Sequence, residues 1–262
     1  MKEVEINIMT ATSTAVSFSS LNTGSADKEA RLHDLMQRYG TLEGHALLEV
    51  MLTDEFSGKI AISSSFGAEA AVLLKLVAEV DKTTPVLFID TGHLFEETLQ
   101  YKTTIEEHLG LSQIITVQPE RIHLDNADAD ATLYQRDTDY CCHIRKVLPF
   151  EKALGPYDAW VSGRKRFQNS ERSKLQGIEL DHDGRFKINP LYNWDYEKVI
   201  AEFKQMVLPK HPLVDKGYPS IGCGPCTRAV KDGEDQRAGR WAGQGKTECG
   251  IHKSPTFEAI YI

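Results

Sequence analysis

Four of the five cysteines occur as two pairs, and paired thiols are common ligands of zinc and of iron–sulfur clusters. Cys141 and Cys142 are adjacent, whereas Cys223 and Cys226 form a Cys-X-X-Cys string. Adjacent ligands suit one tetrahedral zinc ion poorly, because structural zinc sites space each pair by about two to four residues. A cubane offers a separate iron to each thiolate, so the spacing favours a [4Fe–4S] cluster. A redox-active dithiol at Cys223 and Cys226, or buried inert thiols, are the alternatives.

Cys249 has no second cysteine near it in the sequence. A lone cysteine near the end of a chain is more often incidental than functional. Here, however, Lys246, His252 and several arginines lie in the same glycine-rich segment. Neighbouring cations lower the pKa of a thiol and make thiolate available at neutral pH. Cys249 is therefore the candidate nucleophile.

Three consecutive serines end an apolar run that leads into an amphipathic helix pattern. Ser63, Ser64 and Ser65 are followed closely by Gly67. Small side chains let a ligand approach the backbone, and the N–H groups of a first helical turn attract anions. The Walker pattern is absent. The segment is interpreted as a phosphate-binding loop, with an ordinary strand-to-helix connection as the alternative.

Two further polar segments follow apolar runs. Asp90 ends the run 85–90, and four basic residues, among them Arg166 and Arg172, lie within residues 163–172 after a predicted strand. Ligands of open α/β sheets bind at the carboxyl ends of the strands. We therefore expect this basic segment to bind an anion rather than to form a solvated charged loop.

The alternation of strand and helix patterns predicts an α/β fold, a doubly wound and mainly parallel sheet with right-handed crossovers. Strands are predicted at 59–64, 85–90, 114–117, 158–162 and 186–190. Helices are predicted at 70–80, 96–109, 143–154 and 194–206, the last one capped by Asn193, with two more between 26 and 52 that are interrupted near Gly40.

The composition is that of a globular protein with one large domain. The chain has 262 residues, of which 41% are hydrophobic and 26% charged, and a formal net charge of −8 that argues against a nucleic-acid partner. No apolar run is long enough for a membrane span, and the clustered cysteines suit a reducing compartment, so we expect a cytoplasmic protein. Residues 1–25 are predicted to form a mobile arm, 26–236 the α/β domain and 237–262 a flexible tail.

Taken together, these motifs resemble assimilatory adenylylsulfate (APS) reductase, the iron–sulfur branch of the APS and phosphoadenylylsulfate (PAPS) reductase family. The resemblance covers roughly residues 45–253 and includes the serine loop, Leu87-Phe-Ile-Asp90-Thr-Gly92, both cysteine pairs and Glu248-Cys249-Gly-Ile-His252, in the family's order. It implies an adenine-nucleotide α-hydrolase-like fold and a [4Fe–4S] cluster on the four paired cysteines. Relatives that act on PAPS typically lack these pairs, so the resemblance points to APS.

The resemblance also assigns roles to single residues. The serine loop would contact the phosphosulfate end of the nucleotide, and Lys146 would lie between cluster and substrate. Arg237 and Arg240 look like the family's tail arginines. One position departs from the family pattern, because Lys165 stands where an arginine is usual, which leaves Arg166 and Arg172 as the expected anion ligands. The expected substrate-binding residues are Ser63, Ser64, Ser65, Gly67, Asp90, Lys146, Arg166, Arg172, Arg237, Arg240 and His252.

The implied reaction belongs to sulfate assimilation and cysteine biosynthesis. The Cys249 thiolate would attack the sulfur of APS, AMP would leave, and a thioredoxin- or glutaredoxin-like thiol would then release sulfite from an S-sulfocysteine. A homo-oligomer is expected. The alternatives are a PAPS or dual-specificity reductase, an ATP pyrophosphatase, whose usual Asp-Ser is missing from the loop, and a zinc-stabilised binding module in which Cys249 is incidental.

Overall fold

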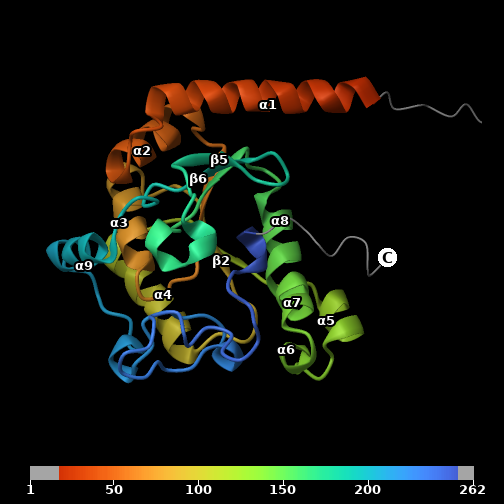
Figure 1. Ribbon diagram of the computed structural model, residues 1–262, viewed down its shortest axis with the longest axis vertical. Helices are drawn as coiled ribbons and strands as arrows, with labels where there is room; N and C mark the ends of the chain where they lie inside the picture. Colours follow the sequence, from red (N-terminus) through yellow and green to blue (C-terminus); the bar gives the residue numbers. More distant parts are fainter. Residues whose placement is uncertain (1–17, 253–262) are drawn as a thin grey trace, which may run out of the picture.

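A six-stranded sheet forms the centre of the protein in the computed structural model, which describes residues 18–252, with side chains from residue 24 (Figure 1). The strand order is β3-β2-β1-β4-β6-β5, and all neighbouring strands are parallel except β5 and β6. The strands are β1 (Ile60–Ser64), β2 (Val86–Ile89), β3 (Ile114–Val117), β4 (Ala159–Val161), β5 (Ile178–Leu180) and β6 (Phe186–Ile188). The expected doubly wound, mainly parallel sheet is therefore confirmed, with β5 as a strand that was not expected.

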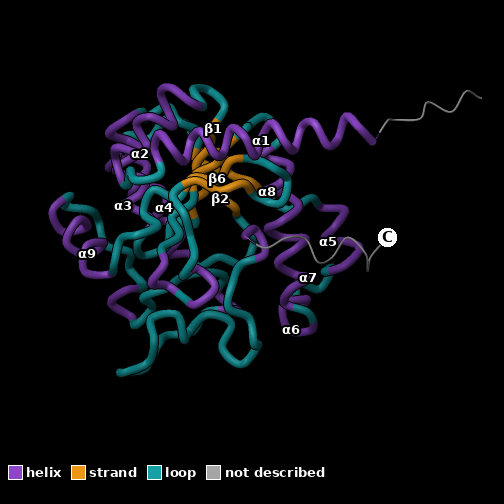
Figure 2. The backbone as a smooth tube through the Cα atoms, turned by 45° about the horizontal axis from the view of Figure 1, so that its top comes forward, coloured by secondary structure: helices purple, strands orange, loops and turns teal. Residues whose placement is uncertain are grey.

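Helices cover both faces of the sheet (Figure 2). One side carries α2 (Gly44–Val50), α3 (Ala70–Val80), α4 (Glu96–Leu109) and α9 (Tyr196–Gln205), with α1 (Phe18–Tyr39) lying across the edge near β5. The other side carries α5 (Arg121–Ala127), α6 (Leu133–Arg136), α7 (Thr138–Cys142) and α8 (Leu148–Leu154).

Side chains on the strands alternate between two cores, as the pleat of a strand requires. In β1, Ile60 and Ile62 belong to the larger core under α3, whereas Ala61 belongs to the smaller core under α8. Trp160 of β4 also faces α8 and packs edge-on against Phe150, with ring centroids 5.1 Å apart. Both faces of the central strands are buried, which explains their near-continuous apolar sequences.

Three helix expectations need correction. Helix α1 starts at Phe18, so residues 18–25 are helical rather than an arm, and residues 1–17 lie outside the described part. Helix α9 starts two residues late, because the carboxylate of Asp195 accepts the N–H of Lys198 at 2.7 Å and acts as the cap. Asn193 instead donates to Glu43.

The predicted helix 143–154 is continuous with α7, but its first turn is π-helical. Residues His143–Val147 form this turn between α7 and α8. A π-helical turn inserts an extra residue into a helix and is frequent at functional sites. Here it contains Lys146. Among the described helices, none is both long enough and apolar enough to cross a lipid bilayer.

Candidate active site

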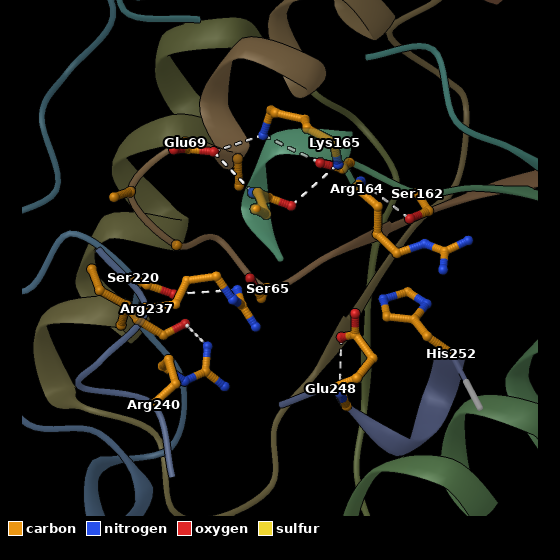
Figure 3. A pocket seen from close by; sticks show the side chains of 18 of the residues that line it. Ser65, Glu69, Ser162, Arg164, Lys165, Ser220, Arg237, Arg240, Glu248 and His252 are labelled. Carbon is orange, nitrogen blue, oxygen red and sulfur yellow. Dashed lines mark hydrogen bonds and ion pairs between the residues drawn. The ribbon is translucent and has the colours of Figure 1, made fainter. Parts of the chain in front are cut away.

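A cavity of about 490 Å³ lies at the carboxyl ends of β1 and β4. The chain leaves β1 toward β2 and β3 on one side, whereas β4 pairs with β1 on the other side. The two loops that leave β1 and β4 therefore diverge and open a crevice, which is where doubly wound sheets bind ligands. Figure 3 shows the polar side chains that converge on this cavity.

The serine loop forms one wall. Ser63, Ser64, Ser65 and Gly67, the residues expected to contact the substrate, all line the cavity. Phe66 adopts a left-handed φ of 48°, is fully buried, and donates its N–H to Ser64 Oγ at 3.2 Å. No side chain caps the start of α3. In its first turn, the N–H of Ala70 donates instead to the carbonyl of Gly67 at 3.0 Å, and the N–H of Val72 donates to the carbonyl of Glu69 at 3.4 Å.

The loop after β4 forms the opposite wall, where Arg172 lines the cavity but the other expected residue, Arg166, does not. Arg164 and Lys165 line the cavity. Lys165 pairs with Glu69 of the serine loop at 2.7 Å, which ties the two walls together. Arg164 pairs with Glu179 at 3.0 Å, while its Nε is buried without a hydrogen-bond partner.

Arg166 and Asp90 were predicted as substrate ligands, but neither lines this cavity. Arg166 donates to the carbonyl of Leu175 at 2.8 Å and to Asn193 at 3.0 Å, because residues 166–168 form a 3-10 turn that directs its side chain away. Asp90 accepts the N–H of Gly92 at 3.0 Å and a bond from Gln118. Both side chains shape their own loops.

Arg237 and Arg240 come from the glycine-rich segment and lie beside the serine loop (Figure 3). Arg240 donates to the carbonyl of Ile221 at 3.1 Å, and its Nε is buried without a partner. Burial, followed by the charges of Arg172 and Arg240, lowers the pKa of Arg237 to about 10. Like charges held together out of water favour an anionic ligand, which would offset their repulsion.

Cys249 lines the same cavity and is half-buried. The preceding residue, Glu248, accepts two hydrogen bonds from Arg172, at 2.5 and 2.7 Å. Arg172 therefore lines the cavity as predicted, but its guanidinium is occupied by this carboxylate. The segment expected to be a flexible tail is held at several points: Trp241 and Glu248 are both 3% exposed and line the cavity, whereas residues 242–245 are exposed. Residues 253–262 lie outside the described part.

His252 also reaches the cavity. Its ring stacks on Trp160, and its Nδ1 is buried without a partner. Burial, followed by the charges of Lys187 and Arg164, lowers the pKa of His252 well below its ordinary value. The imidazole is thus neutral at pH 7 and can accept or donate one hydrogen bond at each nitrogen.

The four paired cysteines come together beside this cavity. Cys141, Cys142, Cys223 and Cys226 are buried free thiols that line one small second cavity. Lys146 lines both cavities, in agreement with its expected place between them. Burial lowers the pKa of Lys146, but the charges of Cys223, Cys142 and Cys249 outweigh burial and leave this pKa raised. Its ammonium therefore stays charged among the sulfurs.

The spacing of the four sulfurs bears on the choice between zinc and a larger group. Around a tetrahedral zinc ion, ligand sulfurs lie roughly 3.8 Å apart, since Zn–S bonds are about 2.3 Å long. In the described chain, potential metal ligands come within 4.8 Å of one another, three at a time, in two places. One is formed by His93, Asp128 and Cys141, and the other by Glu151, His182 and Asp183. No three of the paired cysteines are that close, which fits a cluster better than a single zinc ion.

Sequence reasoning missed Glu69, Ser162, Arg164 and Glu248, which also line the cavity. The basic run 164–166 signalled an anion site, but only the backbone of the loop decides which of its side chains face inward. For Glu248, the only indication in the sequence of a place at the site was its position next to the candidate nucleophile.

Comparisons with known proteins agree with this geometry. A family model described as the phosphoadenosine phosphosulfate reductase domain matches residues 59–229. A protein named adenosine 5′-phosphosulfate reductase from Chelativorans sp. (strain BNC1) is 47% identical over 89% of this chain and 95% of its own length. A protein named phosphoadenosine 5′-phosphosulfate reductase from Gloeobacter violaceus is 40% identical over 75% of this chain and 83% of its own.

The fold has a solved counterpart as well. The crystal structure of phosphoadenylyl-sulfate reductase from Candida auris, a phosphate complex, superposes with a TM-score of 0.64 and 25% identity, and the match covers 76% of this chain and 96% of that one. One family assignment follows from the cavity at the carboxyl ends of β1 and β4, the matched domain and the relatives that match over most of their length. The chain belongs to the phosphoadenosine phosphosulfate reductase domain family.

Proposed function

We propose that this protein reduces adenylylsulfate to sulfite and AMP in assimilatory sulfate reduction. The observation that carries the proposal is the place of Cys249, an unpaired thiol that lines the same cavity as the serine loop and Arg240. A nucleophilic sulfur thus lies within an anion-binding site at the switch point of the sheet. Relatives at 41% to 47% identity that are named adenosine 5′-phosphosulfate reductase support the same substrate.

In the first half of the reaction, the Cys249 thiolate attacks the sulfur of APS. A bond forms between Cys249 Sγ and that sulfur, and the bond from the sulfur to the bridging phosphate oxygen breaks. AMP leaves with the electron pair, and the enzyme carries an S-sulfocysteine. Nucleophile, sulfonate and phosphate are all anionic, so the cations around the cavity are needed to offset their repulsion. The basic residues that line it are Lys146, Arg164, Lys165, Arg172, Arg237 and Arg240, of which Lys165 and Arg172 are paired with Glu69 and Glu248.

In the second half, a dithiol protein of the thioredoxin or glutaredoxin class supplies two electrons. One of its thiolates attacks Cys249 Sγ, sulfite leaves, and its second thiol resolves the mixed disulfide and returns Cys249 to the thiol form. The segment with Cys249 must then leave the cavity, so we propose that residues 237–252 move as a tail during turnover. A dithiol reductant implies a reducing compartment, which supports a cytoplasmic location.

We further propose that Cys141, Cys142, Cys223 and Cys226 hold a [4Fe–4S] cluster. Four buried free thiols around one cavity, wider apart than zinc ligands, are a suitable donor set. Cys141 and Cys142 at the start of the helix that contains Lys146, and Cys223 and Cys226 of the loop 223–226, would hold the cluster from two sides. Lys146 itself, charged and in contact with both cavities, would orient the sulfonate of the substrate.

PAPS remains a second candidate substrate. A relative named phosphoadenosine 5′-phosphosulfate reductase is 40% identical. The two cysteine pairs favour APS, because the resemblance associates them with reductases that act on APS. Steady-state kcat/KM values for APS and PAPS decide between the two.

The test of the reaction uses Cys249→Ser. Wild-type protein mixed with APS and no reductant should release a stoichiometric burst of AMP and carry one added sulfonate on the peptide that contains Cys249. The variant should bind APS and release no AMP. A sulfonate on Cys226, or turnover by Cys249→Ser, would show that another group carries the chemistry.

A further inference from the structure

We propose that Glu248 is a positioning residue, whose ion pair with Arg172 holds the segment that carries Cys249 in the cavity. The inference rests on the proposed function, because it concerns the thiol assigned there as the nucleophile. It adds a role for a carboxylate that neither binds substrate nor takes part in bond making.

The pair is buried and doubly hydrogen-bonded. Arg172 Nε and Nη2 donate to the two Glu248 oxygens at 2.5 and 2.7 Å, and the side chains are 8% and 4% exposed. Two further hydrogen bonds hold Arg172 in place. Its Nη1 donates to the side chain of Gln168, and its backbone N–H donates to the side chain of Asn169 at 2.9 Å. A bidentate pair of this kind fixes geometry as well as charge.

Glu248 acts directly on its neighbour in the chain. Its Oε1, which accepts from Arg172, also accepts the backbone N–H of Cys249 at 2.9 Å (Figure 3). One carboxylate therefore connects a guanidinium fixed in the loop after β4 to the backbone of the nucleophile. Loss of the carboxylate would leave the N–H of Cys249 and both Nε and Nη2 of Arg172 without these bonds.

The same loop holds the residue before Glu248. Asn169 Nδ2 donates to the carbonyl of Thr247 at 3.3 Å, and Thr247 Oγ1 donates to Glu171. These two contacts are on the surface, where competing water makes them weak, whereas the Arg172 pair is buried. Breaking one partner of a buried pair is the costlier loss, so the Glu248 pair holds the segment more firmly than these two contacts do.

If Glu248 positions Cys249, then replacing Glu248 should change the rates of the two half-reactions differently. Formation of the S-sulfocysteine needs Cys249 inside the cavity, whereas its reduction needs Cys249 outside. Weakening the anchor should therefore slow the first half and leave the second unchanged or faster. A role in folding alone would lower both together.

The experiment compares Glu248→Gln and Glu248→Ala with Glu120→Gln. Glu120 pairs with Lys152 on the surface, where the two side chains are 47% and 75% exposed, so its variant controls for loss of a carboxylate. Hydrogen exchange of the substrate-free full-length protein is followed in peptides that span residues 242–252. AMP release in a single turnover and sulfite release from the accumulated intermediate are then timed separately.

Both Glu248 variants should exchange faster in residues 242–252 and form the intermediate at least about tenfold more slowly, with sulfite release not slowed. The Glu120→Gln protein should match wild type in all three measurements. If Glu248→Ala does not fold, Glu248→Gln carries the test, since it keeps the side-chain volume and an oxygen for the Cys249 N–H.

Unchanged exchange in residues 242–252, or equal slowing of both half-reactions, would overturn the proposal. Failure of the proposed function has a different signature. In that case wild-type protein itself releases no AMP from APS, while the exchange comparison still decides whether Glu248 anchors the segment.

Discussion

The imidazole of His252 lies flat on the indole of Trp160, with ring centroids 5.7 Å apart and planes inclined by 5°. Trp160 is firmly held, because its Nε1 donates to Asp181 at 2.8 Å from within β4. The ring of His252, the last residue of the described chain, thus packs against a side chain of β4. His252 lines the cavity, and its Nδ1 is buried without a hydrogen-bond partner.

Replacing His252 should separate its stacking from its hydrogen bonding. His252→Phe keeps an aromatic ring on Trp160 but removes Nδ1, so kcat/KM for APS should fall about tenfold, the equivalent of roughly 1.4 kcal/mol for one lost hydrogen bond. His252→Ala should lose more, because it also removes the stacking. Equal activity of His252→Phe and wild type would assign the residue to packing alone.

The pH dependence follows from the lowered pKa of His252. Burial and the nearby charges of Lys187 and Arg164 hold this pKa well below 6.5, so the ring stays neutral from pH 6 upward and does not titrate there. The profiles of kcat/KM against pH for wild type and His252→Asn should have the same shape between pH 6 and 8. An inflection near pH 6.5 that disappears in the variant would contradict this.

Replacing a basic residue of the cavity should lower kcat/KM for APS more than replacing a basic residue whose side chain points away from the cavity. Arg237→Ala and Arg240→Ala should each lower kcat/KM for APS by at least about tenfold, because a charge-assisted hydrogen bond to an anion is lost. Arg166→Ala is the matched control, since its guanidinium contacts Leu175 and Asn193 outside the cavity. Its kcat/KM should stay within about twofold of wild type. A loss in Arg166→Ala as large as in the other two variants would restore Arg166 as a substrate ligand, as expected from the sequence.

The cysteine pairs should be tested by metal analysis. Anaerobically purified protein should be brown and contain about four irons per chain, because four thiols are available for one cubane. Cys142→Ser should bleach the protein, whereas Cys249→Ser should keep full colour. Zinc in the wild type, or full colour in Cys142→Ser, would remove the cluster assignment.

The sequence predicted the central strands well because each is a short apolar run with both faces buried. It missed β5, the antiparallel edge strand, because its three residues include Glu179 and carry no periodic signal. The four residues expected from the serine loop all line the cavity. Arg164 and Arg166 could not be told apart, because their directions depend on a 3-10 turn that the sequence does not specify. Glu248 depends on Arg172, 76 positions away in the chain, and such pairs are visible only in three dimensions.

Lys187 offers a test of stability that is independent of catalysis. This lysine of β6 is 4% exposed, and its Nζ lies 4.5 Å from the centroid of the Trp160 ring. Burial, followed by the charge of Arg164, lowers the pKa of Lys187 to about 7, although Glu179 and Asp181 act in the opposite direction. Below pH 7 the folded protein therefore carries a buried charge that costs free energy. Above pH 7 the folded form releases the proton, while the unfolded chain keeps it until about pH 10.4.

The folded state should thus gain stability, through Lys187, as the pH rises from about 7 to 10. Lys187→Met removes the charge and keeps an unbranched side chain over Trp160, so it should raise the free energy of unfolding by about 1 kcal/mol or more at pH 6. Urea unfolding at pH 6, 7.5 and 9 should show this gain shrinking at each step. Lys152→Met is the control, because the Lys152 side chain is 75% exposed and should give no pH-dependent gain. A gain that is constant or grows with pH would mean that Lys187 is not buried as a charged group.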